Sequence, residues 1–222
     1  MKKVLILIAS GLILLSALFY LFNFKFPSIK NIETENSLKN GTLLKSEKEK
    51  EAPEKELEYF PPIDKFKERL TKKSFGDYIT PQTSPVQPER FQGYHTGLDF
   101  EIFPGEEEKE IKIFAFCPGK VLEKRKITGY GGVFVQSCQI EGNPVTVLYG
   151  HLKLDSIKQK EGKGLQKGEF IGILGKGYSD ETDGERKHLH FAIHKGTKID
   201  VRGYVQTKGE LQDWINPLPL LN

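Results

Sequence analysis

The sequence predicts an all-β domain over residues 60–222, preceded by one apolar N-terminal helix and a charged linker. Three observations lead to this prediction. After about residue 75 the chain consists of short apolar or alternating runs, separated by Gly, Pro and Asn. No long helical period appears in that part of the chain, and nineteen consecutive residues near the N-terminus carry no charge. Short runs at this spacing, with turn residues between them, are typical of antiparallel β-domains.

Composition excludes several classes of protein. The 222 residues contain 33 Lys and Arg against 30 Asp and Glu, a formal net charge of +3. An excess of three positive charges is too small to neutralise a run of phosphates, so no nucleic-acid partner is expected. The two cysteines are too few for a disulfide-dense scaffold or a four-cysteine zinc finger.

Residues 1–22 are predicted to form a signal anchor, a single transmembrane helix that is not cleaved. The uncharged run extends from Val4 to Phe22 and follows two lysines. At about 1.5 Å per residue it nearly spans a hydrocarbon core of about 30 Å. A cleaved signal is the main alternative and a buried soluble helix the other, although bulky residues follow Ser16-Ala17, where cleavage would need small ones. Lys25 and Lys30 oppose the orientation that places the N-terminus inside.

Residues 23–59 are predicted to be a disordered linker. Lys45 to Glu58 contains four Lys and six Glu in fourteen positions. Such a segment buries too little apolar surface to offset the entropy lost on ordering. A single solvated helix with Glu–Lys pairs is the alternative. After Pro61-Pro62, the helical spacing of Ile63, Phe66 and Leu70 predicts a short amphipathic turn that ends before Gly76.

The expected strands follow in order along the domain. Turn residues precede or separate apolar runs at positions 111–116, 120–122, 133–135, 145–149 and 170–174. A further run, residues 187–193, contains His188 and His190. Residues i and i+2 of a strand share a face, so these two imidazoles project together while Leu189 and Phe191 point into a core. Two adjacent imidazoles are costly to bury without partners, and a metal ion is a common partner. Two half-exposed histidines on an edge strand are the alternative.

Two further segments contain candidate metal ligands. The first runs from His95 to Asp99, and imidazole with carboxylate is a frequent zinc ligand set. In a flat strand these residues lie about 13 Å apart, so the chain must turn between them, and Gly97 permits a turn. The second segment is Tyr149-Gly150-His151, at the end of an apolar run. Taken alone, both segments are also compatible with ordinary loop residues.

In this order, His95-x-x-x-Asp99, His151 within YGHL and His188-x-His190 within HLHF resemble the lysostaphin/LytM-type zinc endopeptidases. The resemblance covers roughly residues 75–218 and implies twisted antiparallel sheets that form a groove. It makes His95, Asp99 and His190 the ligands of one zinc ion and places His151 and His188 beside them as catalytic residues. Three protein ligands leave the open fourth position of a catalytic zinc site. Of the two catalytic histidines, we favour His188 as the general base.

The chain departs from the family pattern at positions that bear on groove shape. Glu185-Arg186-Lys187 stands before HLHF, where small residues or proline are usual. Residues 179–187 and 198–212 resemble insertions that line the groove. For the additional groove tyrosine of the family, Tyr94 and Tyr149 are candidates only because they are near the motifs.

Four other residues, a histidine, a tryptophan and two cysteines, have expected positions. His194 is expected to be a surface histidine, since it lies about 13 Å along the strand from His190. Trp214 is expected to be a packing residue. Cys117 and Cys138 are 21 positions apart, and a disulfide and two buried free thiols remain equally open.

The resemblance implies a membrane-anchored zinc metalloendopeptidase that hydrolyses peptide cross-links of bacterial cell-wall peptidoglycan. The apolar helix predicts a single-pass protein of the cell membrane with its catalytic domain outside the cytoplasm. One alternative is an inactive family member that binds or activates another cell-wall hydrolase, although all five site positions are filled. A lipoyl- or biotinyl-type carrier module is disfavoured, because Met1 is the only methionine.

Overall fold

The computed structural model describes residues 58–222. The predicted anchor and nearly all of the predicted linker lie outside this range. No helix within residues 58–222 is long and apolar enough to cross a membrane. Tyr59, the last residue assigned to the linker, belongs to the domain, because its buried ring stacks on Phe116 with centroids 4.7 Å apart.

The described residues form antiparallel strands with a few short helices, as the sequence predicts. The strands are β1 Tyr78–Ile79, β2 Gly93–His95, β3 Gly97–Glu101, β4 Lys112–Phe114, β5 Gly119–Ile127, β6 Gly131–Ile140, β7 Asn143–Leu152, β8 Gly164–Leu165, β9 Phe170–Ile173, β10 His188–Lys195, β11 Tyr204–Val205 and β12 Trp214–Ile215. The helices are α1 Phe66–Arg69, η1 Leu154–Ser156, η2 Asp180–Thr182, α2 Lys208–Leu211 and η3 Leu218–Leu221. Helix α1 is the amphipathic turn expected after Pro61-Pro62.

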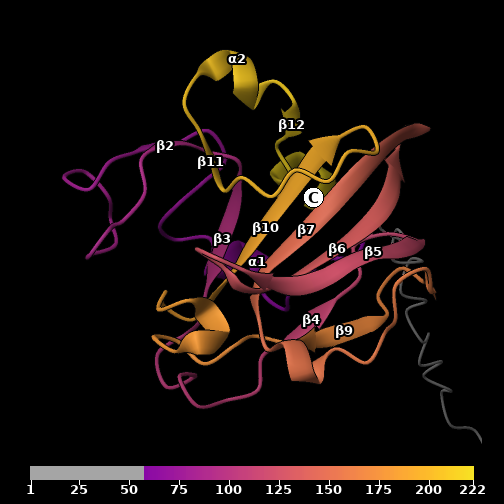
Figure 1. Cartoon of the computed structure of the whole chain (residues 1–222), viewed down its shortest axis with the longest axis horizontal. Helices are drawn as coiled ribbons and strands as arrows, with labels where there is room; N and C mark the ends of the chain where they lie inside the picture. The colour runs from indigo at the N-terminus through magenta and orange to yellow at the C-terminus, as the bar shows by residue number, and fades with distance from the viewer. Residues whose placement is uncertain (1–57) are drawn as a thin grey trace, which may run out of the picture. The chain divides into compact units, whose positions relative to one another are not determined.

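One large sheet organises the domain (Figure 1). Its strand order is β12-β10-β7-β6-β5-β8, and β3 also pairs with β10. Strands β3 and β12 share one edge of β10, since β3 pairs with residues 188–192 and β12 with residues 193–194. Two small sheets, β1-β2-β11 and β4-β9, complete the described fold. Every strand pair in the described range is antiparallel.

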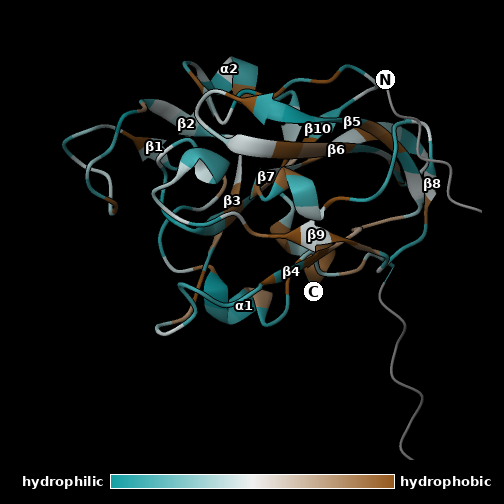
Figure 2. Ribbon diagram, turned by 60° about the horizontal axis from the view of Figure 1, so that its bottom comes forward, coloured by the Kyte–Doolittle hydropathy of each residue, from teal (hydrophilic) through white to brown (hydrophobic). Residues whose placement is uncertain are grey.

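The two faces of the large sheet have different roles. Odd-numbered residues of β10, such as Leu189 and Phe191, point into the main core, which also contains Ile113 of β4 and Ile171 of β9. In the turned view the large sheet lies over the β4–β9 pair (Figure 2). The opposite face carries a smaller apolar cluster that includes Leu148, Ala192 and Trp214. Because side chains alternate along a strand, His188 and His190 lie on this second face with Ala192.

A disulfide joins Cys117 and Cys138 in the main core, with Cα atoms 6.0 Å apart. This resolves the alternative that the sequence leaves open. Cys117 lies just before β5, and Cys138 lies in β6, the strand that pairs with β5. Trp214 is buried in the smaller cluster and is a packing residue, as expected.

Candidate metal centre

The candidate site begins with the pairing of β3 and β10. Their antiparallel register places Asp99 opposite His190 and Glu101 opposite His188. Residues two apart share a face, so four polar side chains from two adjacent strands project together. All four residues are buried, with between 2% and 7% of their surface exposed. A buried set of imidazoles and carboxylates of this kind requires internal partners.

His95 reaches the same place from a different sheet. It ends β2, and the chain then enters β3, so the short segment from His95 to Asp99 crosses between two sheets. The expected change of course lies at Thr96, the one residue between β2 and β3, but Gly97 serves another purpose. A Cβ atom at Gly97 would lie 2.4 Å from the carbonyl oxygen of Phe191. Glycine is therefore required here by the close approach of β3 to β10, and not by a left-handed backbone.

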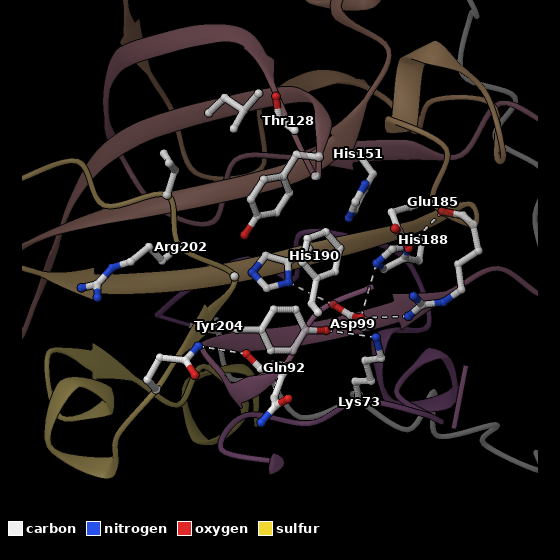
Figure 3. A pocket seen from close by; sticks show the side chains of 18 residues that line it. Lys73, Gln92, Asp99, Thr128, His151, Glu185, His188, His190, Arg202 and Tyr204 are labelled. Carbon is white, nitrogen blue, oxygen red and sulfur yellow. Dashed lines mark hydrogen bonds and ion pairs between the residues drawn. The ribbon is translucent and has the colours of Figure 1, made fainter. Parts of the chain in front are cut away.

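Three potential ligand atoms, from His95, Asp99 and His190, converge at the centre of the site. Figure 3 shows two of these residues, Asp99 and His190, pointing toward each other. His95 Nε2 lies 3.1 Å from Asp99 Oδ1 and 3.0 Å from His190 Nδ1. His190 Nδ1 lies 3.0 Å from Asp99 Oδ1. A tetrahedral zinc ion with bonds of about 2.0–2.1 Å holds its ligands about 3.3 Å apart. The three atoms form a triangle of nearly this size, so the donor set fits one such ion with small movements.

Hydrogen bonds on the outer side of two rings set their tautomers. The Nδ1 atom of His95 lies 3.1 Å from the carbonyl oxygen of Ser74, and Nδ1 of His188 lies 2.9 Å from that of Arg186. A carbonyl oxygen accepts only from a donor, so Nδ1 of each ring carries a proton, and in the neutral form of the ring Nε2 carries the lone pair. The Nε2 of His95 faces the ligand triangle, and that of His188 lies 3.4 Å from Asp99 Oδ2.

His151 enters the site through an irregularity in β7. Gly132 of β6 pairs with Leu152 and the next residue, Val133, pairs with Gly150, so His151 is an extra residue, a β-bulge. Its backbone is left-handed, with φ of +63°. Regular alternation would direct its side chain away from Gly150 and into the main core. The bulge instead directs the ring toward His188, with centroids 4.1 Å apart.

Burial and charge hold these groups in the forms that a metal requires. Burial is the main cause that lowers the pKa of His190 to about 4. Burial and then the charge of His188 hold the pKa of His151 well below its usual range. Burial alone would raise the pKa of Asp99, but the charges of His95 and His188 and its hydrogen bonds outweigh burial and lower it strongly. At neutral pH His190 is therefore a neutral imidazole and Asp99 an ionised carboxylate, the forms that bind metal.

The comparison with protein families agrees with this geometry, because the profile of Peptidase family M23 matches residues 93–201. The domain belongs to this family. The matched range begins with β2 and includes all five of the predicted site residues.

Individual proteins similar to the chain include a phage enzyme and several solved structures. Endolysin 2638A of Staphylococcus phage 2638A is 27% identical over 149 residues, which cover 61% of this chain and 30% of the endolysin. The chain therefore spans less than a third of that relative. The structure of LytU is 24% identical in sequence. The match covers 68% of this chain and 82% of the LytU chain, with a TM-score of 0.44. A putative glycyl-glycine endopeptidase LytM from Ruminococcus gnavus is 19% identical, with coverages of 74% and 59% and a TM-score of 0.42.

The M23 domain has a cavity of about 330 Å³ over the site, and two tyrosines line it. Tyr130 and Tyr204 are these groove tyrosines, whereas the two candidates taken from sequence do not line the cavity. Tyr149 is fully buried and donates a hydrogen bond to Gln136 in the core. Tyr130 lies in the turn between β5 and β6, between Gly129 and Gly131, where the local sequence indicates only a turn. A Cβ at Gly150, opposite His190, would lie 2.5 Å from the Tyr130 ring, so glycine makes room for this tyrosine.

Both insertion-like segments reach the groove of the M23 domain, as predicted. Glu185 and Arg186 come from the first, and Val201 to Tyr204 from the second. Three buried polar atoms near the ligand triangle have no hydrogen-bond partner within residues 58–222, namely Tyr130 OH, His151 Nδ1 and His190 Nε2. Buried polar groups are normally paired, so unpaired ones at a site indicate places for a ligand.

His194 was expected on the surface, and this expectation is wrong. The residue is only 7% exposed. Strand β12 pairs with β10 beyond the end of β3 and places Trp214 against the His194 ring, with centroids 4.9 Å apart. His194 lies outside the set of residues that could hold a metal.

Proposed function

We propose that the chain is a zinc metalloendopeptidase that hydrolyses peptide cross-links of bacterial cell-wall peptidoglycan. One observation carries the proposal: His95 Nε2, Asp99 Oδ1 and His190 Nδ1 converge beside two further buried histidines. Three ligands and an open position are typical of catalytic zinc sites, whereas structural sites are closed by four protein ligands. A zinc ion held there supplies Lewis acidity and makes a nucleophile available at neutral pH.

The residues around the ligands provide the proton transfers that peptide hydrolysis needs. In its neutral form His188 directs the lone pair of Nε2 at the site, because Nδ1 donates to the Arg186 carbonyl, so it can take a proton from the attacking water and deliver it to the leaving amine. Asp99 Oδ2, 3.4 Å away, stabilises the imidazolium formed in between. His151 is held neutral and can donate a hydrogen bond to the oxygen of the scissile carbonyl. The unpaired hydroxyl of Tyr130 is a second donor.

The decisive test is hydrolysis of purified peptidoglycan by the full-length chain, measured as new amino groups, with and without a metal chelator. We expect chelator to stop the release and added zinc to restore it. The His190→Ala variant is the matched control and should be inactive under all three conditions. If the wild-type protein releases no new amino groups in a chelator-sensitive way, the peptidase proposal fails and an inactive binding or activating protein is favoured.

We also propose that residues 1–22 anchor the protein in the cell membrane, with the M23 domain outside the cytoplasm. The uncharged run from Val4 to Phe22 supports this location, and a disulfide in the core fits an oxidising compartment. Protease added to intact spheroplasts should digest the domain, while a cytoplasmic control protein survives until the cells are lysed. A domain that resists protease until lysis would contradict the proposed orientation.

A further inference from the structure

Arg186 is a buried cation inside the candidate metal centre, and its role goes beyond the ligands and catalytic histidines. It lies two residues before His188, and only 6% of its surface is exposed. Its guanidinium contacts two carboxylates at once. Nη2 lies 2.8 Å from Asp99 Oδ2 and 2.6 Å from Glu101 Oε1, and Nε lies 3.0 Å from each oxygen of Glu101.

Glu101 holds Arg186 in place, and the strand register explains why. Glu101 follows Asp99 by two residues on β3, so both carboxylates project from the same face of the strand. Arg186 therefore meets a pair of neighbouring carboxylates, to which the planar, forked guanidinium is well matched. One buried cation stands beside two buried anions, so these three residues keep one excess negative charge. Exposed Lys72 adds a longer contact of 3.5 Å to Glu101.

The two oxygens of Asp99 consequently have separate partners. Oδ1 belongs to the ligand triangle with His95 and His190. Oδ2 accepts the hydrogen bond from Arg186 on the other side. Since a carboxylate is planar, fixing Oδ2 also fixes the direction of Oδ1. We propose that Arg186, held by Glu101, is a positioning residue that makes Asp99 a one-oxygen ligand of the metal.

This inference rests on the proposed function only in requiring that the site binds a divalent metal. Partners that orient a metal ligand commonly contribute about 10- to 100-fold to metal affinity. Without Arg186, Asp99 is free to rotate or to bind through both oxygens, and Glu101 is left unpaired beside it. The consequence is a change in affinity and in coordination number, and neither depends on peptidase activity.

The test measures zinc affinity by chelator competition and the visible spectrum of the cobalt-loaded, full-length protein. In the Arg186→Met variant we expect zinc affinity to fall about 10- to 100-fold and the intense bands of four-coordinate cobalt to weaken. In Arg186→Lys we expect the charge to remain but the affinity to stay low, because an ammonium lacks the fork. The Arg69→Met variant is the control, since Arg69 is also buried but pairs with the side chains of Glu106 and Asp64 outside the ligand set. Arg69 reaches Glu101 only at the backbone carbonyl oxygen and does not touch the carboxylate that holds Arg186. This variant should keep the wild-type spectrum.

A double variant, Arg186→Met with Glu101→Met, separates positioning from folding. Replacing a whole buried ion pair by apolar residues is often tolerated, whereas removing one partner leaves a buried charge. We expect the double variant to fold and still to bind zinc weakly. Wild-type affinity in the double variant or in Arg186→Lys, or an unchanged spectrum in folded Arg186→Met, would overturn the inference. If the wild-type protein binds no metal, the proposed function itself is wrong. If it binds zinc but does not hydrolyse peptidoglycan, only the proposed peptidase activity is wrong, and the inference about Arg186 can still be tested.

Discussion

His188 and His190 are two residues apart on one strand, but their rings have different surroundings. His190 Nδ1 belongs to the ligand triangle, 3.0 Å from both His95 Nε2 and Asp99 Oδ1. His188 instead donates from Nδ1 to a backbone carbonyl and leaves Nε2 facing the outer oxygen of Asp99. Two histidines of the same strand face thus have different surroundings. The His190 ring is suited to binding a metal, and the His188 ring is suited to accepting a proton.

Alanine substitutions should separate these two roles. We expect His190→Ala to lose both bound zinc and hydrolysis, because it removes one of three ligands. We expect His188→Ala to keep zinc but to lose about 10²- to 10⁴-fold in hydrolysis, the usual contribution of a general base. Metal analysis of each purified variant, together with release of amino groups from peptidoglycan, measures both effects.

His194 provides the control for this pair. It is a buried histidine on the same face of β10, but it packs against Trp214 outside the ligand set. His194→Gln should therefore keep both zinc and hydrolysis, even where it lowers thermal stability. A His188→Ala protein that contains no zinc would mean that the roles within the HLHF pair are assigned wrongly.

At the scale of elements, the contact between β3 and β10 determines whether the site assembles. We expect Gly97→Ala to lower the free energy of unfolding by about 1–3 kcal/mol, the typical cost of overpacking. The added Cβ would lie 2.4 Å from the backbone oxygen of Phe191 and 3.0 Å from the Ala192 side chain, so β3 must move away from β10. Zinc affinity should fall with stability, because Asp99 lies on the displaced strand. Urea unfolding and chelator competition measure the two quantities.

Gly164→Ala is the matched control for this strand glycine. Within 4 Å a Cβ at Gly164 would meet only the carbonyl oxygen of Gly119, at 4.0 Å, and the residue lies in β8, away from the site. This substitution should leave zinc affinity unchanged and stability equal or slightly higher, since alanine restricts the unfolded chain. If Gly97→Ala and Gly164→Ala have the same stability and zinc affinity, the close contact between β3 and β10 does not require glycine.

The segment before β2 is held to the groove by a buried ion pair. Lys73 Nζ contacts Glu89, whose side chain is 2% exposed, and also donates to the hydroxyl of groove residue Tyr204 over 3.0 Å. Glu89 accepts further hydrogen bonds from Ser84 and from the backbone of Phe91. Burial alone raises the pKa of Glu89, but its bonds with Lys73 and the Phe91 backbone bring it below the usual 4.5.

Glu89→Gln should therefore destabilise the protein in a pH-dependent way. A depressed pKa in the folded state gives stability that is complete above the unfolded pKa of about 4.5. This stability is lost as pH falls below that value and the wild-type carboxylate is protonated. We expect the difference in unfolding free energy between wild type and variant to be constant from pH 7 to about 5 and to shrink below about 4.5. Urea titrations at several pH values measure it, and a difference that is independent of pH would contradict the ion pair.

Much of the order of strands is predictable from sequence, because alternation of apolar and polar residues indicates which side chains of a strand face the core. The runs at 133–135 and 145–149 lie within β6 and β7, and those at 111–116 and 187–193 overlap β4 and β10. His188 and His190 share one face of β10, as their parity predicts, since the alternate residues Leu189 and Phe191 lie in the main core. Arg186 and Glu101 continue the same parity from His188 and Asp99, so the sequence already indicates that they share the face of the site. The bulge at His151 and the close approach at Gly97 depend on pairing between distant strands, which no local pattern encodes. His194 was misjudged for the same reason, since β12 covers it.

At the scale of the whole molecule, one disulfide links strand β6 of the large sheet to the segment just before β5. The disulfide between Cys117 and Cys138 closes a loop with a separation of 21 residues, which contains β5 and most of β6. Both cysteines are buried in the main core beneath the sheet whose other face carries the candidate metal centre. The link restricts the unfolded chain, and by loop entropy alone it contributes about 3 kcal/mol for a loop of roughly this size.

The double variant Cys117→Ala with Cys138→Ala should therefore unfold at lower urea concentration, with a loss of about 3 kcal/mol. A reductant should destabilise the wild-type protein by a similar amount and leave the double variant unaffected, which separates loss of the bond from loss of packing. Zinc affinity, measured in parallel on folded protein, should change little, because the bond lies on the opposite face from the ligands. If oxidised and reduced wild-type proteins unfold at the same urea concentration, the disulfide does not form in solution. The proposed location outside the cytoplasm would then rest on the apolar N-terminal run alone.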